Sequence, residues 1–185
     1  MWKAGRLKRQ MKTAVFGLFL FIAFISGCTK YDSVSSKAAI QAQAVIDDSM
    51  ITQYLKANGL TATTIDTTGV RYIIDTLGAS NSLYTNSTSV TVGYTGTLLG
   101  YTGTATSGDV KIGGVFAQTN NFHPSFVLGT LIRGWQLGVP KVGQGGTITL
   151  FVPSRNAYGP YAQPIIGLPA NAVLIFIITV YNVTN

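Results

Sequence analysis

Few side chains in this sequence could carry acid–base, nucleophilic or metal-dependent chemistry. His123 is the only histidine, Cys28 is the only cysteine, and the chain of 185 residues contains six acidic residues. A zinc site needs several such ligands close together, and His123 stands alone before Pro124 in a stretch typical of a loop. We therefore expect His123 to face solvent, and we expect neither a bound metal nor a cofactor.

Aromatic side chains set among glycines are the more informative candidates. Trp135 lies between Gly134 and Gly138 in the segment 132–138, and two further segments with aromatic residues follow at 152–159 and 168–176. Taken alone, Trp135 could be the largest core residue of a small domain, and Tyr158 could be a loop tyrosine beside a turn. In this order the three segments resemble the signature of FKBP-type peptidyl-prolyl cis/trans isomerases, which favours a pocket role for both residues.

The resemblance covers roughly Gly69 to Asn182 and implies the composition of a site. By this resemblance the pocket residues that act on the substrate are Tyr94, Phe116, Ile132, Trp135, Tyr158 and Phe176, with further substrate contacts from Leu131, Ala157 and Leu168. The backbone N–H of Ile132 and the hydroxyl of Tyr158 correspond to the family's donors to a bound carbonyl.

These residue types suit the reaction that the resemblance implies, which is rotation about a prolyl peptide bond. The barrier to this rotation is roughly 18–20 kcal/mol because twisting destroys amide resonance, and no covalent bond is broken. The twisted amide carries less charge on its oxygen, so an apolar site favours it over the planar ground state. We expect proline-containing polypeptides as substrates, with an apolar residue preferred before the proline.

Two departures from the family pattern bear on activity. Ala117 follows Phe116, where the resemblance implies an aspartate that orients the tyrosine and borders the reacting amide. The glycine- and threonine-rich stretch from Gly100 to Gly114 is an insertion without the ending of a phosphate-binding loop, so we expect a flexible surface loop.

The main alternative function is a catalytically weak FKBP-like chaperone or peptide-binding lipoprotein. A structural or surface-glycan lipoprotein ranks last, because an apolar pocket with few carboxylates fits glycans poorly.

The strands that position these residues are predicted by periodicity. Apolar and polar residues alternate over 69–74, 90–95 and 148–152, a mostly apolar strand follows at 173–183, and 126–128 is a short candidate. Several strands with one short helix between them indicate an α+β fold. The resemblance implies a strongly twisted antiparallel sheet wrapped on that helix.

An amphipathic helix is predicted ahead of this domain, from Lys37 to Asn58. Its apolar residues recur every three or four positions, at Ala39, Ala42, Ile46, Met50, Tyr54 and Ala57. The pair Asn58-Gly59 provides a stop. Such a stripe is more typical of a face that packs against the following domain than of a surface for a partner.

The amino-terminal residues are typical of a bacterial export signal. A basic start precedes the apolar run 14–24, and Ile25-Ser26-Gly27-Cys28 resembles the lipobox of bacterial lipoproteins. We expect a lipid anchor on Cys28 and attachment to a bacterial membrane. An aspartate directly after the cysteine resembles an inner-membrane retention signal of bacterial lipoproteins. Thr29 stands at this position here, so the outer membrane is favoured.

These segments divide the chain into three parts and limit its partners. We expect a signal peptide at 1–27, a lipidated tether with the helix at 28–60, and an isomerase domain at 61–185. The formal charge is +7, but five basic residues lie in the first twelve, which leaves a net charge of +2 without a basic cluster. We therefore expect no nucleic-acid partner, and we expect a monomer.

Overall fold

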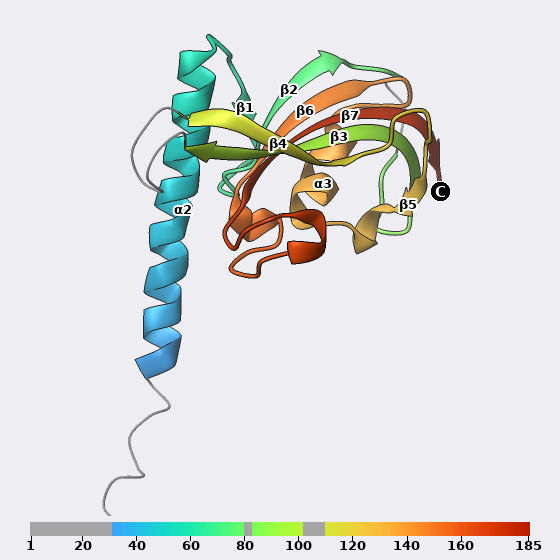
Figure 1. Ribbon diagram of the computed structural model, residues 1–185. Coiled ribbons are helices and arrows are strands. Elements are labelled where there is room, and N and C mark those ends of the chain that lie inside the picture. The colour runs from blue at the N-terminus through green and yellow to red at the C-terminus, as the bar shows by residue number, and fades with distance from the viewer. Residues whose placement is uncertain (1–30, 80–82, 102–109) are drawn as a thin grey trace, which may run out of the picture. The chain divides into compact units, whose positions relative to one another are not determined.

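The part of the chain described by the computed structural model comprises residues 31–79, 83–101 and 110–185 (Figure 1). The predicted signal peptide and Cys28 lie outside the described residues. Within the described ranges, no helix is both long and apolar enough to span a bilayer.

An antiparallel sheet forms the centre of the fold. The strands are β1 (Thr63–Thr64), β2 (Arg71–Thr76), β3 (Ser89–Tyr101), β4 (Val110–Gln118), β5 (Ser125–Val127), β6 (Thr147–Val152) and β7 (Val173–Thr184). Their order is β1-β2-β6-β7-β3-β4, and β5 pairs with the start of β3. Figure 1 shows the twisted sheet curving around a short helix, α3, which confirms the predicted α+β fold.

The predicted strands appear close to their expected positions because alternate apolar residues point to one buried face. Val90 and Val92 of β3, and Ile148 and Leu150 of β6, have no exposed surface. Strand β2 begins at Arg71 rather than at Gly69. Gly69 has a φ of +77°, a left-handed conformation that an extended strand does not adopt.

The stretch from Gly100 to Gly114 was predicted to be a surface loop, and for its two ends this prediction is wrong. Strand β3 continues to Tyr101 and β4 begins at Val110, with Gly100 opposite Lys111 and Leu99 opposite Ile112. Residues 102–109 lie outside the described part. The glycines and threonines obscured the period-two pattern, and register shifts in this pairing disturb it further.

The helix α3 (Arg133–Gly138) packs closely on β6 because two of its residues have no side chain. A Cβ on Gly134 would lie 2.5 Å from Val152 Cγ1, and a Cβ on Gly138 would lie 2.4 Å from Leu150 Cδ2. Four 3₁₀ turns complete the connections, η1 (Leu128–Thr130), η2 (Val139–Lys141), η3 (Ser154–Asn156) and η4 (Pro164–Ile166). The two glycines thus bring Trp135, which lies between them, against the sheet.

The helix α2 (Tyr31–Ala57) begins before its predicted start at Lys37 and ends at the predicted stop. The chain forms two compact units, and the larger one, Ile40–Asn185, contains most of α2 together with the sheet. The predicted domain boundary between residues 60 and 61 therefore falls inside this unit.

Within the larger unit, α2 covers part of the sheet face opposite α3. Met50, Ile51 and Leu55 are buried in a cluster completed by Leu99, Val110, Phe151, Val173 and Ile175. The predicted stripe is displaced, because Ala42 and Ala57 are exposed while the larger Ile51 and Leu55 are buried. Larger aliphatic side chains gain more free energy on burial than alanine, so they determine which face of the helix packs.

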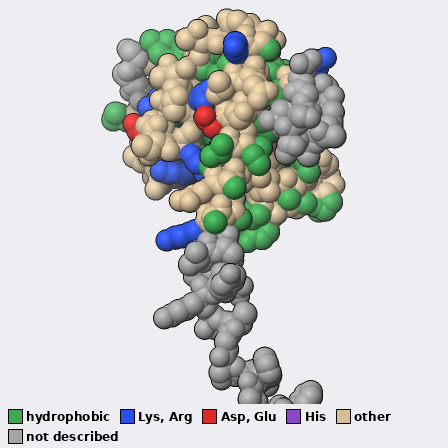
Figure 2. All heavy atoms as spheres, turned by 90° about the vertical axis from the view of Figure 1, so that its left-hand side faces the viewer, with side chains coloured by type: hydrophobic (Ala, Val, Ile, Leu, Met, Phe, Trp, Pro, Cys, Tyr) green, Lys and Arg blue, Asp and Glu red, His purple; other side chains and the backbone are tan. Residues whose placement is uncertain are grey.

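Figure 2 looks onto the α2 side of the molecule, where acidic and basic side chains lie near one another. Arg71 of β2 forms an ion pair with Asp48 of α2, and it also donates a hydrogen bond to Thr52 Oγ1 at 2.9 Å. Asp48 is largely exposed, and exposed ion pairs contribute at most about 1 kcal/mol. The helix is therefore held on the sheet mainly by its apolar residues.

Candidate functional site

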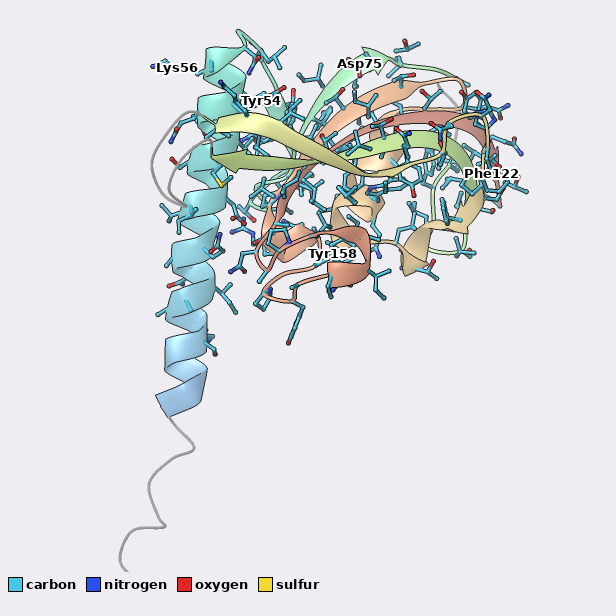
Figure 3. All side chains as sticks on the ribbon, viewed as in Figure 1. Tyr54, Lys56, Asp75, Phe122 and Tyr158 are labelled. Carbon is cyan, nitrogen blue, oxygen red and sulfur yellow. The ribbon has the colours of Figure 1, made fainter. Side chains whose placement is uncertain are left out.

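A cavity of about 230 Å³ lies on the face of the sheet that carries α3. It is lined by Tyr94, Phe116, Ala117, Phe126, Leu131, Ile132, Trp135, Tyr158, Ile166 and Phe176. Seven of the nine residues predicted for the pocket are in this set. Figure 3 shows Tyr158 on the connection between β6 and β7, on the same side of the sheet as α3.

Trp135 is almost completely buried beside the cavity and is surrounded by other rings edge to face. Its indole centroid lies 5.1 Å from that of Tyr94, 5.4 Å from that of Phe176 and 6.4 Å from that of Phe126, with interplanar angles of 86–90°. Such pairs contribute about 0.5–1.5 kcal/mol each beyond their burial. The rings therefore hold one another in a fixed and apolar arrangement.

The indole Nε1 of Trp135 is buried and has no hydrogen-bond partner among the described residues. Leaving a buried donor unpaired costs about 1–3 kcal/mol. An acceptor on a ligand that reached this nitrogen would recover part of that cost.

Strand β4 supplies one wall of the cavity through Phe116 and Ala117. The Phe116 ring meets that of Phe176 edge to face, with centroids 5.6 Å apart. Ala117 presents a methyl group where the family resemblance implies a carboxylate, and no carboxylate is among the residues that line the cavity. The site therefore has no group of its own to act as a general base.

Tyr158 is held by a compact turn that follows β6. The carbonyl oxygen of Ser154 accepts hydrogen bonds from the backbone N–H groups of Ala157, at 2.9 Å, and Gly159, at 2.8 Å. Burial, and to a smaller extent the nearby Tyr94, raise the pKa of Tyr158 above its usual value. Its hydroxyl therefore remains protonated, and able to donate, at every physiological pH.

The backbone N–H of Ile132 is a second donor at the cavity. Ile132 precedes the first turn of α3, with φ of −57° and ψ of 150°, and its carbonyl accepts from the N–H groups of Trp135 and Gln136. No described residue accepts a hydrogen bond from the Ile132 N–H itself. The first N–H groups of a helix commonly remain available in this way.

Two residues predicted to contact substrate do not line the cavity. Leu168 is buried in the core beneath it, and Ala157 packs against the same core while its neighbour Tyr158 faces the cavity. A direct contact of either residue with substrate stays a prediction.

The structure adds Phe126 and Ile166 to the predicted lining. Phe126 belongs to β5 and lies opposite Val90. Its alternation with the exposed Val127 was the sequence signal that could have placed it on the buried face of the strand. Ile166 lies in η4 after Pro164, in a loop without periodicity. No pattern in the sequence could have placed it.

Potential metal ligands are not grouped at this site or elsewhere in the described ranges, where no three histidine, cysteine or acidic side chains come together. His123 is exposed, and its ring stacks on that of Tyr181 with centroids 3.9 Å apart. This position agrees with the solvent-facing loop residue expected from the sequence.

Comparison with known proteins gives the family of the chain. A model described as FKBP-type peptidyl-prolyl cis-trans isomerase matches residues 81–181, which is more than half of the sequence. The chain is 32% identical over 117 residues to the FKBP-type peptidyl-prolyl cis-trans isomerase FkpA of Buchnera aphidicola subsp. Schizaphis graminum, covering 63% of this chain and 42% of that protein. It is 35% identical over 87 residues to FK506-binding protein 1 of Candida glabrata, covering 47% of this chain and 68% of that protein.

Solved structures agree with this assignment at the level of the fold. The crystal structure of FkpA from Escherichia coli matches with a TM-score of 0.59 at 24% identity, covering 96% of this chain and 82% of that one. A peptidyl-prolyl cis-trans isomerase from Pseudomonas syringae pv. tomato matches with a TM-score of 0.58 at 21% identity, covering 81% of this chain and 96% of that one. The chain belongs to the FKBP-type peptidyl-prolyl cis-trans isomerase family.

Proposed function

We propose that the chain catalyses cis/trans isomerisation of prolyl peptide bonds in exported polypeptides. The observation that carries this proposal is the aromatic cavity with two hydrogen-bond donors, the Ile132 N–H and the Tyr158 hydroxyl, and no acid–base pair. Pockets for drug-sized ligands measure about 300–1,000 Å³, so a cavity of about 230 Å³ suits a single side chain such as the proline ring.

The proposed mechanism is desolvation of the reacting amide. Uncatalysed isomerisation is slow because the planar amide is stabilised by resonance, which separates charge between oxygen and nitrogen. The twisted amide has lost this charge separation and needs less solvation by water. An apolar cavity therefore destabilises the planar form relative to the twisted one.

In this mechanism the two donors orient the substrate. The Ile132 N–H and the Tyr158 hydroxyl hold a backbone carbonyl of the polypeptide, and the ring of Trp135 supports the proline ring from below. Backbone recognition of this kind demands no sequence beyond proline. The walls from Phe116 and Phe126 favour an apolar residue before the proline.

The proposed place of action is a bacterial membrane surface. Cys28 follows a leader that ends in small residues, as expected for lipid modification of the thiol. A diacylglycerol group on the thiol and an acyl chain on the new amino terminus together would hold the protein stably on a membrane. We favour the outer membrane. Detergent phase partitioning of the protein expressed in a Gram-negative host tests this anchor, since the wild type should enter the detergent phase and a Cys28→Ser variant should not.

A second function, peptide binding without efficient catalysis, is favoured by one observation. Ala117 lines the cavity in place of the carboxylate that the family resemblance implies. A retained apolar cavity without this group would still bind proline-containing segments, as a chaperone does.

Refolding of a protein whose slow phase is limited by prolyl isomerisation separates the two functions. An isomerase shortens the slow phase at substoichiometric concentration, whereas a binding module slows refolding or leaves its rate unchanged. Trp135→Ala and Tyr158→Phe should reduce the acceleration. Tyr181→Phe is the matched control, because Tyr181 is half exposed and packs on His123 away from the cavity. Equal acceleration by wild type and Trp135→Ala would refute the proposed site.

A further inference from the structure

The side chain of Asp47, on α2, is completely buried although it carries a carboxyl group. Its Oδ2 accepts hydrogen bonds from the backbone N–H of Ser154, at 2.8 Å, and from Ser154 Oγ, at 2.7 Å. Its Oδ1 accepts from Gln43 Nε2 at 2.7 Å. No described cation pairs with it. A buried acid is costly unless hydrogen bonds replace its water, and here three donors do so.

An acid at this place is not needed to dock the helix. Met50, Ile51 and Leu55 bury the apolar face of α2 on the sheet, and replacing both partners of a buried hydrogen bond by apolar groups of the same shape can be nearly neutral or stabilising. What Asp47 adds is a directional link to one residue, Ser154, which is the first residue of η3.

Ser154 in turn fixes the backbone on both sides of Tyr158. Its carbonyl oxygen accepts from the N–H groups of Ala157 and Gly159, the two neighbours of Tyr158. The hydrogen bonds therefore form a connected network. Ser154 donates to the Asp47 carboxyl group, and the carbonyl oxygen of Ser154 holds the turn that presents the Tyr158 hydroxyl at the cavity. Asp47 does not line the cavity itself.

We propose that Asp47 is a positioning residue for the prolyl site. Through Asp47, α2 contributes to the geometry of the isomerase site as well as to the stability of the fold. This inference rests on the proposed function of the cavity. Asp47 lies before residues 81–181, the region that matches the family model, and before the predicted domain start at residue 61. The smallest fully active unit therefore includes α2 from at least Gln43, whose amide supports the same carboxyl group.

The test compares three variants of the full-length chain in mild detergent, all assayed at a temperature where circular dichroism shows them folded. Asp47→Ala removes the acceptor for both Ser154 donors. Asp47→Asn keeps an acceptor oxygen of the same reach. Ile51→Ala is the matched control, because it weakens the packing of α2 on the sheet without touching Ser154.

We expect Asp47→Ala to lower kcat about tenfold or more with a smaller change in KM, because small displacements of an orienting group reduce rate steeply. Asp47→Asn should recover most of that loss. Ile51→Ala should keep kcat within about twofold of the wild type although it also destabilises the fold. The backbone amide NMR signals of Ala157 and Gly159 should shift in Asp47→Ala and remain in place in Ile51→Ala.

Two results would overturn the inference. One is a loss of kcat in Ile51→Ala that equals the loss in Asp47→Ala, which would reduce Asp47 to a contribution to stability. The other is an unchanged pair of amide signals for Ala157 and Gly159 in Asp47→Ala. If the wild type itself does not accelerate isomerisation, the proposed function fails, and the amide signals still decide whether Asp47 positions the turn.

Discussion

Replacing Gly134 by alanine tests how closely α3 must approach the sheet. The added Cβ would lie 2.5 and 2.8 Å from the two γ carbons of Val152. Val152 is fully buried in β6 and β-branched, so its side chain has little freedom to move aside. Overpacking of this kind costs about 1–3 kcal/mol, whereas alanine in place of glycine in a helix gains about 1 kcal/mol.

A contact of 2.5 Å is far closer than carbon–carbon van der Waals contact, so the cost of overpacking should lie in the upper part of this range, at about 2–3 kcal/mol. After subtraction of the gain in helix propensity, the free energy of unfolding of Gly134→Ala should fall by about 1–2 kcal/mol. For a domain of this size the melting temperature should fall by about 3–6 °C. Urea denaturation followed by circular dichroism measures the change, with the m-value expected to stay constant. Because α3 carries Trp135, the displaced helix should also lower kcat/KM.

Gly114→Ala is the control for this prediction. Gly114 lies exposed in β4, and a Cβ there would meet nothing within 4 Å. Its free energy of unfolding should change by no more than about 0.5 kcal/mol. If Gly134→Ala unfolds at the same urea concentration as Gly114→Ala, the close approach of α3 to Val152 does not constrain the fold and the reasoning is refuted.

Three further predictions concern the cavity and the opposite face of the sheet. Ala117→Asp should raise the isomerisation rate by restoring the carboxylate of the family pattern, and an unchanged rate would remove Ala117 as the cause of weak catalysis. Tyr158→Phe should lower kcat/KM about three- to tenfold, the value of one hydrogen bond, and the wild-type rate should stay flat from pH 5 to 9 because the pKa of Tyr158 is raised by burial. The raised pKa also stabilises the folded state relative to the unfolded state, and this stabilisation is fully present below about pH 10, the pKa of tyrosine in the unfolded chain. It is lost as pH rises through the folded pKa, so the difference in stability between wild type and Tyr158→Phe should change during alkaline unfolding. Phe151→Ala should cost about 3–5 kcal/mol of unfolding free energy, since Phe151 is buried between sheet and α2, yet leave kcat of the folded protein near that of wild type; a loss of kcat would show that this cluster shapes the cavity.

The sequence predicted those elements whose residues satisfy local and tertiary preferences together. Strand β6 alternates Ile148, Leu150 and Val152 toward the core, so its period is plain. The end of α2 is equally plain, since Gly59 adopts a left-handed φ of +62° that terminates a helix at little cost.

The elements that the sequence missed depend on contacts between distant segments. Strand β4 has glycines at 113 and 114 and exposed residues over most of its length, so only its pairing with β3 makes it a strand. Ile166 reaches the cavity because the β6–β7 connection folds back. No pattern in the sequence distinguishes Asp47, and its burial becomes apparent only when Ser154 is placed beside it.

Catalysis at this cavity can be observed directly by NMR exchange spectroscopy of an Xaa-Pro peptide with the full-length chain and its Trp135→Ala variant. We expect the wild type, at catalytic concentration, to accelerate exchange between the cis and trans signals, and Trp135→Ala to accelerate it far less. No acceleration by the folded wild type, with peptide still shifting the ring signals of Trp135 and Tyr94, would contradict catalysis at this cavity and leave a peptide-binding site in its place.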